Sequence, residues 1–260
     1  MIDIEKAKEE FLKYTANYDH HSDKIERKEK HSLRVVERST MIANYLKLNE
    51  EDRLLAELIG LLHDIGRFEQ VKRANTFSDV KSGINHGELG AEILFKEGLI
   101  RRFVEEDTYD EIIRKAIVNH NKTYIEPGLN ERELLFAHII RDADKADIMY
   151  IIATDDIYKD STEDDYNTGA ITAELMKQFL GDGYLDYKLI QSRGDDILTV
   201  YAMLADVQYP VTAEYILNEK FVDIFTQRIY DSYHNPAFIR DIEVCHKVSY
   251  DRLKKIAERQ

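Results

Sequence analysis

The stretch NEEDRLLAELIGLLHDIG, residues 49–66, combines an apolar helix with two potential metal ligands. Its apolar side chains recur at the spacing of one helix face, at Leu55, Leu58, Ile59 and Leu62. Asn49 is suited to cap the N-terminus of this helix, and Gly66 is a typical residue to end it. An imidazole and a carboxylate, His63 and Asp64, follow the apolar run directly. A core helix that ends in these groups predicts a buried metal site at its C-terminus.

Helical spacing recurs along most of the chain. It predicts further helices at residues 2–14, 31–46, 86–98, 109–120, 131–153, 169–183 and 194–207, with others after Pro210 and Pro236. Residues 68–85 show no period and are expected to form a loop. No segment alternates in the way that a strand does, so the predicted fold is all-α. We expect a helical core at residues 1–155 and a helical extension at 156–260, packed on the core as one compact unit.

Composition narrows the classes of partner. The formal net charge of −14 disfavours binding to a phosphate backbone, so DNA is not an expected partner. No apolar run approaches the ~18 residues of a membrane span, so we expect no membrane partner. The charged start MIDIEKAKEE does not resemble a secretory signal, and a single cysteine, Cys245, suits a reducing compartment. A cytoplasmic location is expected.

Potential ligands stand at five helix ends or core-facing helix positions. They are His31, the pair His63 and Asp64, His86, His120, and a carboxylate within residues 141–147, RDADKAD. His120 faces the core because it follows Ile113 and Ile117 at i+7 and i+3. A His-acid pair alone is weak evidence, since 9 histidines and 50 acidic residues predict about two such pairs by chance. The order of all these candidate ligands along the chain is therefore more informative than any single pair.

This set resembles the HD-domain superfamily of metal-dependent phosphohydrolases, whose H…HD…D pattern lies on a helical bundle. The resemblance covers residues 30–150 and implies an HD-domain bundle with additional C-terminal helices. His31 matches the first histidine, and HDIG at residues 63–66 is close to the defining motif. ADKAD, residues 143–147, is similar to the late helix of the family, which places the last ligand at Asp144. Asp142 is the alternative, because periodicity does not separate the two.

HGELGAEIL and AIVNH resemble the segments that carry extra histidines in HD proteins with two metals. The resemblance implies that His86 and His120 hold a second ion, with Asp64 bridging. Two alternatives stay open for these histidines: a direct contact with phosphate, or a structural hydrogen bond to a loop carbonyl. Cyclic-dinucleotide phosphodiesterases have a further histidine where this chain has Asn121, and their GYP motif is missing here. Alarmone hydrolases have an HD-x-x-E-D extension, whereas Arg67 and Phe68 stand at those positions. Both activities are therefore disfavoured.

The mixed histidine and carboxylate donors suit one or two divalent ions, among Mn²⁺, Fe²⁺, Co²⁺, Ni²⁺, Zn²⁺ and Mg²⁺. Such ions activate water and polarise phosphoryl oxygens, and Asp64 is placed to orient that water. Arg67, one turn past the ligands, is placed to contact a phosphate oxygen. The alternative is that its positive charge only stabilises the C-terminus of the helix. Lys122 and Lys145 are weaker phosphate candidates.

The predicted function is metal-dependent hydrolysis of a phosphomonoester, phosphodiester or phosphoanhydride. The expected substrate is a nucleotide or another small phosphorylated molecule. Two alternatives stay open: a di-iron oxygenase on the HD fold, and a non-catalytic sensor of metal and nucleotide. The tyrosines beyond residue 155, including Tyr166 and Tyr201, are expected in the core or over the pocket.

Overall fold

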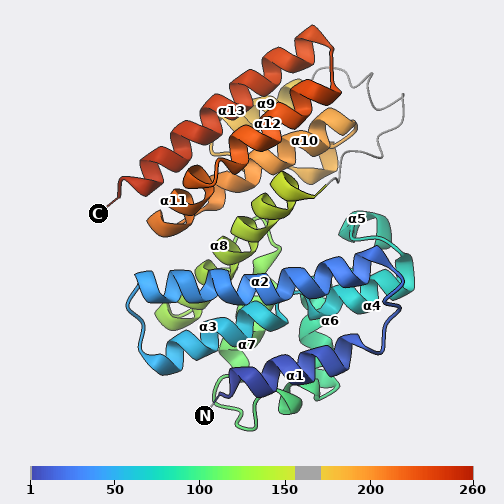
Figure 1. The fold of residues 1–260 in the computed structure, drawn as a ribbon, viewed down its shortest axis with the longest axis vertical. Helices are drawn as coiled ribbons and strands as arrows, with labels where there is room; N and C mark the ends of the chain where they lie inside the picture. Colours follow the sequence, from blue (N-terminus) through green and yellow to red (C-terminus); the bar gives the residue numbers. More distant parts are fainter. Residues whose placement is uncertain (1, 156–170, 260) are drawn as a thin grey trace. The chain divides into compact units, whose positions relative to one another are not determined.

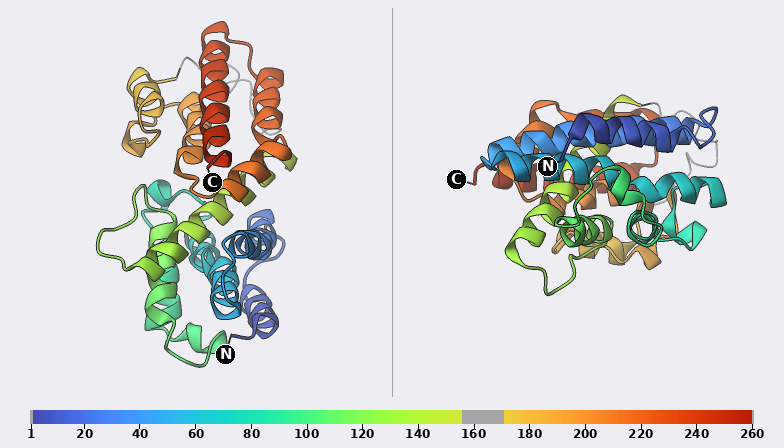
Figure 2. Two further views of the ribbon diagram at one scale, coloured as in Figure 1. Left: turned by 90° about the vertical axis from the view of Figure 1, so that its left-hand side faces the viewer. Right: turned by 90° about the horizontal axis from the view of Figure 1, so that it is seen from below.

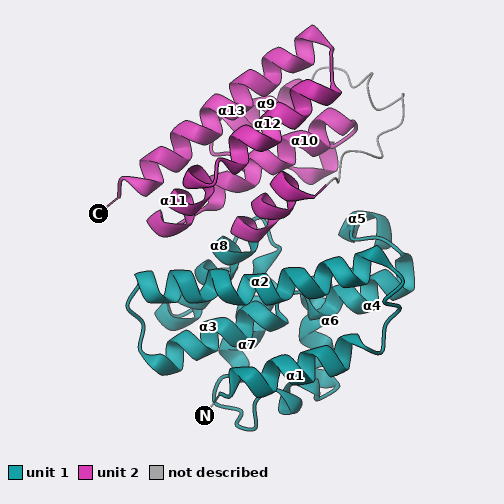
Figure 3. Ribbon diagram, in the orientation of Figure 1, with its two compact units in different colours: residues 1–144 teal, residues 145–260 magenta. Residues whose placement is uncertain are grey.

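The computed structural model describes residues 2–155 and 171–259. Every regular element in these two ranges is helical, which confirms the predicted all-α class. The chain divides into two compact units, residues 1–144 and 145–260 (Figure 3). This division falls inside one long helix, whereas the sequence placed its boundary after residue 155. The predicted domain organisation stays a prediction, and each unit is described by itself.

Unit 1 is built from helices of very different lengths (Figure 1). They are α1 (Ile4–Thr15), α2 (Asp23–Tyr45), α3 (Glu50–Leu62), α4 (Ile65–Ala74), α5 (Asp79–Ser82), α6 (His86–Ala91), the π-helix η1 (Glu92–Lys96), the 3-10 helix η2 (Leu99–Arg102), α7 (Asp110–His120) and the first part of α8 (Glu131–Thr154). As predicted, Asn49 caps α3, because its side chain accepts a hydrogen bond from the Asp52 backbone N–H at 2.9 Å.

The core of unit 1 centres on α2 and α3, which pack along their lengths (Figures 1 and 2). Val35 and Ile42 of α2 are fully buried, as helical spacing predicted. The four predicted apolar positions of α3 are buried too: Leu55, Leu58, Ile59 and Leu62. This apolar contact anchors the end of α3, and with it the metal-ligand candidates that follow.

Residues 68–85 are not the predicted loop. The helix α4 continues through Ala74, and the one-turn helix α5 follows at Asp79–Ser82. Ile65, Phe68 and Val71 of α4 are buried at a spacing of three residues, which is a narrow helical stripe between charged side chains. The prediction was wrong because this stripe begins before residue 68 and was divided between two segments.

Gly66 is likewise not a helix stop but part of the first turn of α4. A Cβ atom at Gly66 would lie 2.3 Å from the His86 carbonyl oxygen and 2.6 Å from the Gly90 nitrogen. The backbones of α4 and α6 therefore approach each other more closely than any side chain permits. This contact brings the start of α6, which carries His86, next to the start of α4.

Unit 2 contains the rest of α8 and a second group of helices. They are α9 (Ala173–Leu180), the 3-10 helix η4 (Tyr187–Leu189), α10 (Arg193–Ala202), the 3-10 helix η5 (Met203–Asp206), α11 (Pro210–Asn218), α12 (Phe221–Ser232) and α13 (Pro236–Ala257). The long helix α13 packs against α10, α11 and α12 (Figure 2). Prolines open α11 and α13, where an N-terminal proline loses no helical hydrogen bond.

The predictions for unit 2 are confirmed in part. Helix α9 ends at Leu180, three residues before the end of the segment predicted at residues 169–183, and residues 169 and 170 of that segment lie outside the described ranges. Tyr201 is buried in the core of unit 2, with its hydroxyl 2.8 Å from that of Thr226, and Tyr166 also lies outside the described ranges. None of the described helices combines the length and the apolarity that crossing a membrane requires.

Candidate metal centre

His63 and Asp64 occupy the junction between α3 and α4. His63 caps the C-terminus of α3, and Asp64 immediately precedes α4. Both side chains are buried. The His63 Nδ1–H donates to the Gly60 carbonyl oxygen at 2.8 Å, which leaves the Nε2 lone pair available to a metal. Neighbouring side chains point about 100° apart inside a helix, so the break between two helices lets these two face one point.

Two further donors reach this point from α2 and α8. His31 Nε2 lies 3.2 Å from His63 Nε2 and 3.1 Å from Asp144 Oδ1. Asp64 Oδ2 is 3.5 Å from each of the two Nε2 atoms. Atoms bound to one ion at about 2.1 Å lie roughly 3.0–3.4 Å apart at octahedral or tetrahedral angles. The observed separations therefore suit a single ion among these four residues.

The position of Asp144 bears on the choice that periodicity left open. Its Oδ1 lies 3.6 Å from His63 Nε2 as well as close to His31. Asp142 is two residues earlier on α8, so its side chain leaves the helix about 200° away. The geometry favours Asp144 over Asp142 as a candidate fourth donor, and its role as a ligand stays a prediction.

A second group of donors adjoins the first. His86, the first residue of α6, and His120, the last of α7, have their Nε2 atoms 2.9 Å apart. Asp64 Oδ1 lies 3.4 Å from His86 Nε2 and 3.6 Å from His120 Nε2. The helix ends predicted to hold extra histidines therefore meet at the same carboxylate as the first group.

The tautomers of His86 and His120 are fixed by their other ring nitrogens. The His120 Nδ1–H donates to the Ile117 carbonyl oxygen at 2.5 Å, and the His86 Nδ1–H donates to the Asp79 carboxylate at 2.7 Å. Burial, assisted by the charge of Arg67, lowers the pKa of His86 to about 3, and burial also lowers the pKa of His120. Two neutral imidazoles thus turn acceptor nitrogens toward each other. A positive charge between the two lone pairs, carried by a proton or by a metal ion, would satisfy both nitrogens.

Asp64 joins the two groups, because each of its oxygens faces a different one. Oδ2 faces His31 and His63, while Oδ1 faces His86 and His120. Burial alone would raise the pKa of Asp64, but the charges of Lys28 and His63 outweigh it and hold the pKa well below its usual range. The carboxylate is therefore ionised, as a bridge between two metal ions must be.

The carboxylates also act on His63. Burial would lower its pKa, but Asp64 and Asp144 reverse that effect and raise the pKa to about 10. Their negative charge therefore favours a positive charge at this point, whether a proton or a metal ion carries it.

Two cations border the donors. Lys28 Nζ lies 2.5 Å from Asp64 Oδ2, and Arg67 Nε lies 3.5 Å from Asp64 Oδ1. Arg67 also pairs with Asp79 at 2.9 Å and with the Gln70 side chain at 2.8 Å. The predicted position of Arg67 beside the ligands agrees with this geometry. The remaining phosphate candidates are engaged elsewhere: Lys122 pairs with Glu126 at 2.5 Å, and Lys145 pairs with Asp206 of unit 2 at 2.6 Å.

Sequence reasoning missed three contributors. Lys28 precedes His31 by three residues and therefore shares its helix face, a signal that was present but not used. Asp79 pairs with His86, and Asn121 Nδ2 donates to Asp79 at 3.1 Å. Asp79 lies in a segment whose conformation the pattern did not predict, so no signal in the sequence indicated its approach. Asn121 directly follows a predicted helix, and its position beside His120 was a signal that was present but not used.

The comparisons with known proteins agree with this geometry. Residues 29–149 match the model of the HD domain family. The chain carries an HD domain. No curated protein and no solved structure matched the chain. The HD domain is typical of metal-dependent phosphohydrolases and binds divalent metals. Two buried groups of donors fit that chemistry, because in each group the donor atoms lie close enough to hold an ion. The first group is His31, His63 and Asp64, and the second is Asp64, His86 and His120.

Proposed function

We propose that this HD-domain protein is a two-metal phosphohydrolase that cleaves a small phosphorylated substrate, such as a nucleotide. The observation that carries the proposal is the orientation of Asp64, whose two oxygens each face a separate pair of histidines. A carboxylate shared in this way suits two ions about 3.5–4 Å apart, the spacing used for phosphoryl chemistry. Bound there, the ions would supply an activated water near neutral pH and polarise the phosphoryl oxygens.

Each residue has a defined part in this proposal. His31, His63, Asp64 and Asp144 hold the first ion, and Asp64, His86 and His120 hold the second. The ionised Asp64 also accepts a hydrogen bond from the attacking water and thereby orients it. All of these donors except Asp144 are buried, which excludes bulk water from them and strengthens the electrostatic interactions within the site.

Lys28 and Arg67 supply positive charge at the border of the site. Both are within 3.5 Å of Asp64, and their side chains are each 16% exposed. They are therefore reachable by a substrate yet screened less than surface cations. We infer that they contact the non-bridging phosphate oxygens. The formal net charge of −14 supports a small substrate rather than a long polyanion.

The test joins metal analysis to a substrate screen. The purified protein is loaded in turn with Mn²⁺, Fe²⁺, Co²⁺, Ni²⁺, Zn²⁺ or Mg²⁺ and assayed on phosphomonoesters, phosphodiesters and dinucleoside polyphosphates. We expect turnover that His63→Ala abolishes while the helical circular dichroism persists. His246→Ala is the matched control, because His246 pairs with Asp223 in unit 2 at 2.7 Å and should leave turnover unchanged. Full turnover by metal-free His63→Ala would overturn the proposal.

A di-iron oxygenase is the second candidate, favoured by the same histidine-rich, carboxylate-bridged donor set. The Fe²⁺-loaded protein distinguishes the two. Consumption of oxygen together with inactivity on every phosphoester would favour the oxygenase. Metal retention without either reaction would instead indicate a sensor of metal and nucleotide.

A further inference from the structure

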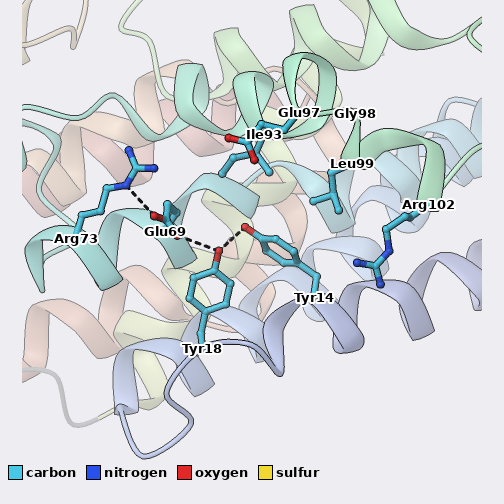
Figure 4. Close-up of a pocket in the computed structure, with 9 residues that line it drawn as sticks. All are labelled: Tyr14, Tyr18, Glu69, Arg73, Ile93, Glu97, Gly98, Leu99 and Arg102. Atoms are coloured by element: carbon cyan, nitrogen blue, oxygen red, sulfur yellow. Dashed lines mark hydrogen bonds and ion pairs between the residues drawn. The ribbon is translucent and has the colours of Figure 1, made fainter.

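Unit 1 has a cavity apart from the metal centre, formed by α1, α4, η1, η2 and the residues that follow α1 and η1. Its volume is about 400 Å³, within the range of sites that hold small molecules. It is lined by Tyr14, Tyr18, Glu69, Arg73, Ile93, Glu97, Gly98, Leu99 and Arg102 (Figure 4). None of these residues is a donor of the metal centre. The cavity is therefore a separate feature that the phosphohydrolase proposal does not use.

Two tyrosines form a polar and aromatic wall of this cavity. Their hydroxyl oxygens lie 2.7 Å apart, and Tyr18 OH donates to Glu69 Oε2 at 3.3 Å. The Tyr14 side chain is buried, and both rings contact Phe68 at centroid distances of 6.1 and 5.7 Å. Lys72 Nζ already lies 5.8 Å from the centre of the Tyr18 ring. This aromatic surface is thus rigidly held and attractive to an ammonium group.

The charges around the cavity leave one carboxylate available. Arg73 is bound to Glu69 at 2.8 Å, and Arg102 is bound to Glu10 at 2.7 Å. Within the part of the chain that the structure describes, Glu97 has no ion-pair partner. Its carboxylate lies across the cavity from the two tyrosine hydroxyls (Figure 4). A positively charged group in the cavity would pair with Glu97 without displacing an existing ion pair.

We propose that this cavity binds a small organic amine. The ammonium group pairs with Glu97 and contacts the tyrosine wall, while its hydrocarbon chain packs on Ile93 and Leu99. A size-matched carboxylate would meet Glu97 and the polarised phenols with the wrong charge. The electrostatic potential at Tyr18 is also negative. Burial raises the pKa of Tyr18 to about 12, and the negative charges of Glu69 and Glu97 act in the same direction.

Isothermal titration of the full-length protein at pH 7 tests this site. The probes are n-butylamine, putrescine and choline, and butyrate is the anionic control of similar size. Glu97→Gln removes the charge at an exposed position, so the variant should fold normally. Glu92→Gln is the control, because Glu92 is the first residue of η1, the helix that Glu97 caps, and it is exposed and does not line the cavity.

We expect at least one amine to bind, with an affinity about tenfold weaker in Glu97→Gln and unchanged in Glu92→Gln. The affinity should be equal with and without a metal chelator, because the site is separate from the metal centre. The proposal is overturned if no amine binds at millimolar concentration, if butyrate binds as tightly, if both variants weaken binding equally, or if a chelator abolishes it.

Discussion

The Nε2 atoms of His86 and His120 lie 2.9 Å apart and face the same oxygen of Asp64. Each ring already donates its Nδ1 hydrogen, to Asp79 and to the Ile117 carbonyl respectively. Two neutral rings therefore cannot form a hydrogen bond with each other, whereas a proton or a metal ion between the two nitrogens accounts for the contact. This relationship, together with the orientation of Asp64, supports the proposed second metal position.

Replacing His120 with Ala should remove the second ion while leaving the first. We expect turnover to fall by orders of magnitude and the metal content to fall from two ions to one per chain. Thermal stability should change little, whereas loss of a purely structural histidine would lower the free energy of unfolding by ~1–3 kcal/mol with a modest kinetic effect. Metal analysis, steady-state kinetics and thermal unfolding of the same sample separate the two outcomes. His246→Ala serves again as the control.

Asp79→Asn tests the residue that orients His86. The amide keeps the size of the side chain but loses the charge that accepts the His86 Nδ1–H at 2.7 Å. Partners of this kind typically change metal affinity or activity by roughly 10–100-fold. We expect a loss of this size for the second ion only, measured by titration with a metal chelator. Asp19→Asn, on the exposed surface, should have no effect. Equal weakening of both ions would contradict the assignment.

Lys28→Met tests the cation beside Asp64 Oδ2. Lys28 competes with a metal for this oxygen, at 2.5 Å, so its removal should preserve or tighten metal binding. Turnover should nevertheless fall, because a positive charge near the phosphate is lost. Metal titration and kinetics of one preparation reveal this opposite behaviour. Lys30→Met is the control, since Lys30 pairs with Glu26 on the exposed side of α2. A parallel loss of metal and activity would show that Lys28 merely supports the fold.

Gly66→Ala tests the close approach of α4 and α6. The added methyl would lie 2.3 Å from the His86 carbonyl oxygen, so one helix must move. Overpacking of this type costs about 1–3 kcal/mol in the free energy of unfolding. We expect this loss in urea denaturation, together with weaker binding of the second ion. Gly181→Ala, whose nearest neighbouring atom is 3.3 Å away, is the milder comparison. An unchanged affinity for both ions would separate this contact from the metal centre.

Much of the fold could be predicted because its helices carry wide apolar stripes. Leu55, Leu58 and Ile59 indicated α3, and the order of the histidines indicated which helix ends would meet. The end of α3 was placed too late because Gly66 resembles a helix stop. Its actual role, to admit the backbone of α6, depends on a tertiary contact that local sequence does not encode.

The ligand set was more predictable than its surroundings. The helix ends identify His63, His86 and His120 directly, whereas the contribution of Asp79 depends on how α5 folds back toward α6. The division of the structure at residue 144 lies inside α8, where an uninterrupted helix offers no breaker that a sequence pattern could use. A sequence pattern therefore predicts which helix ends carry candidate ligands, but not which side chains from other segments will contact them in the folded chain.

Anomalous diffraction from crystals of the Mn²⁺-loaded or Fe²⁺-loaded protein tests whether Asp64 bridges two metal ions. We expect two anomalous peaks about 3.5–4 Å apart. One should lie among His31, His63 and Asp144 and contact Asp64 Oδ2, and the other should contact Oδ1 beside His86 and His120. A single fully occupied peak in metal-saturated crystals, or two peaks of which neither touches Asp64, would contradict this bridging role.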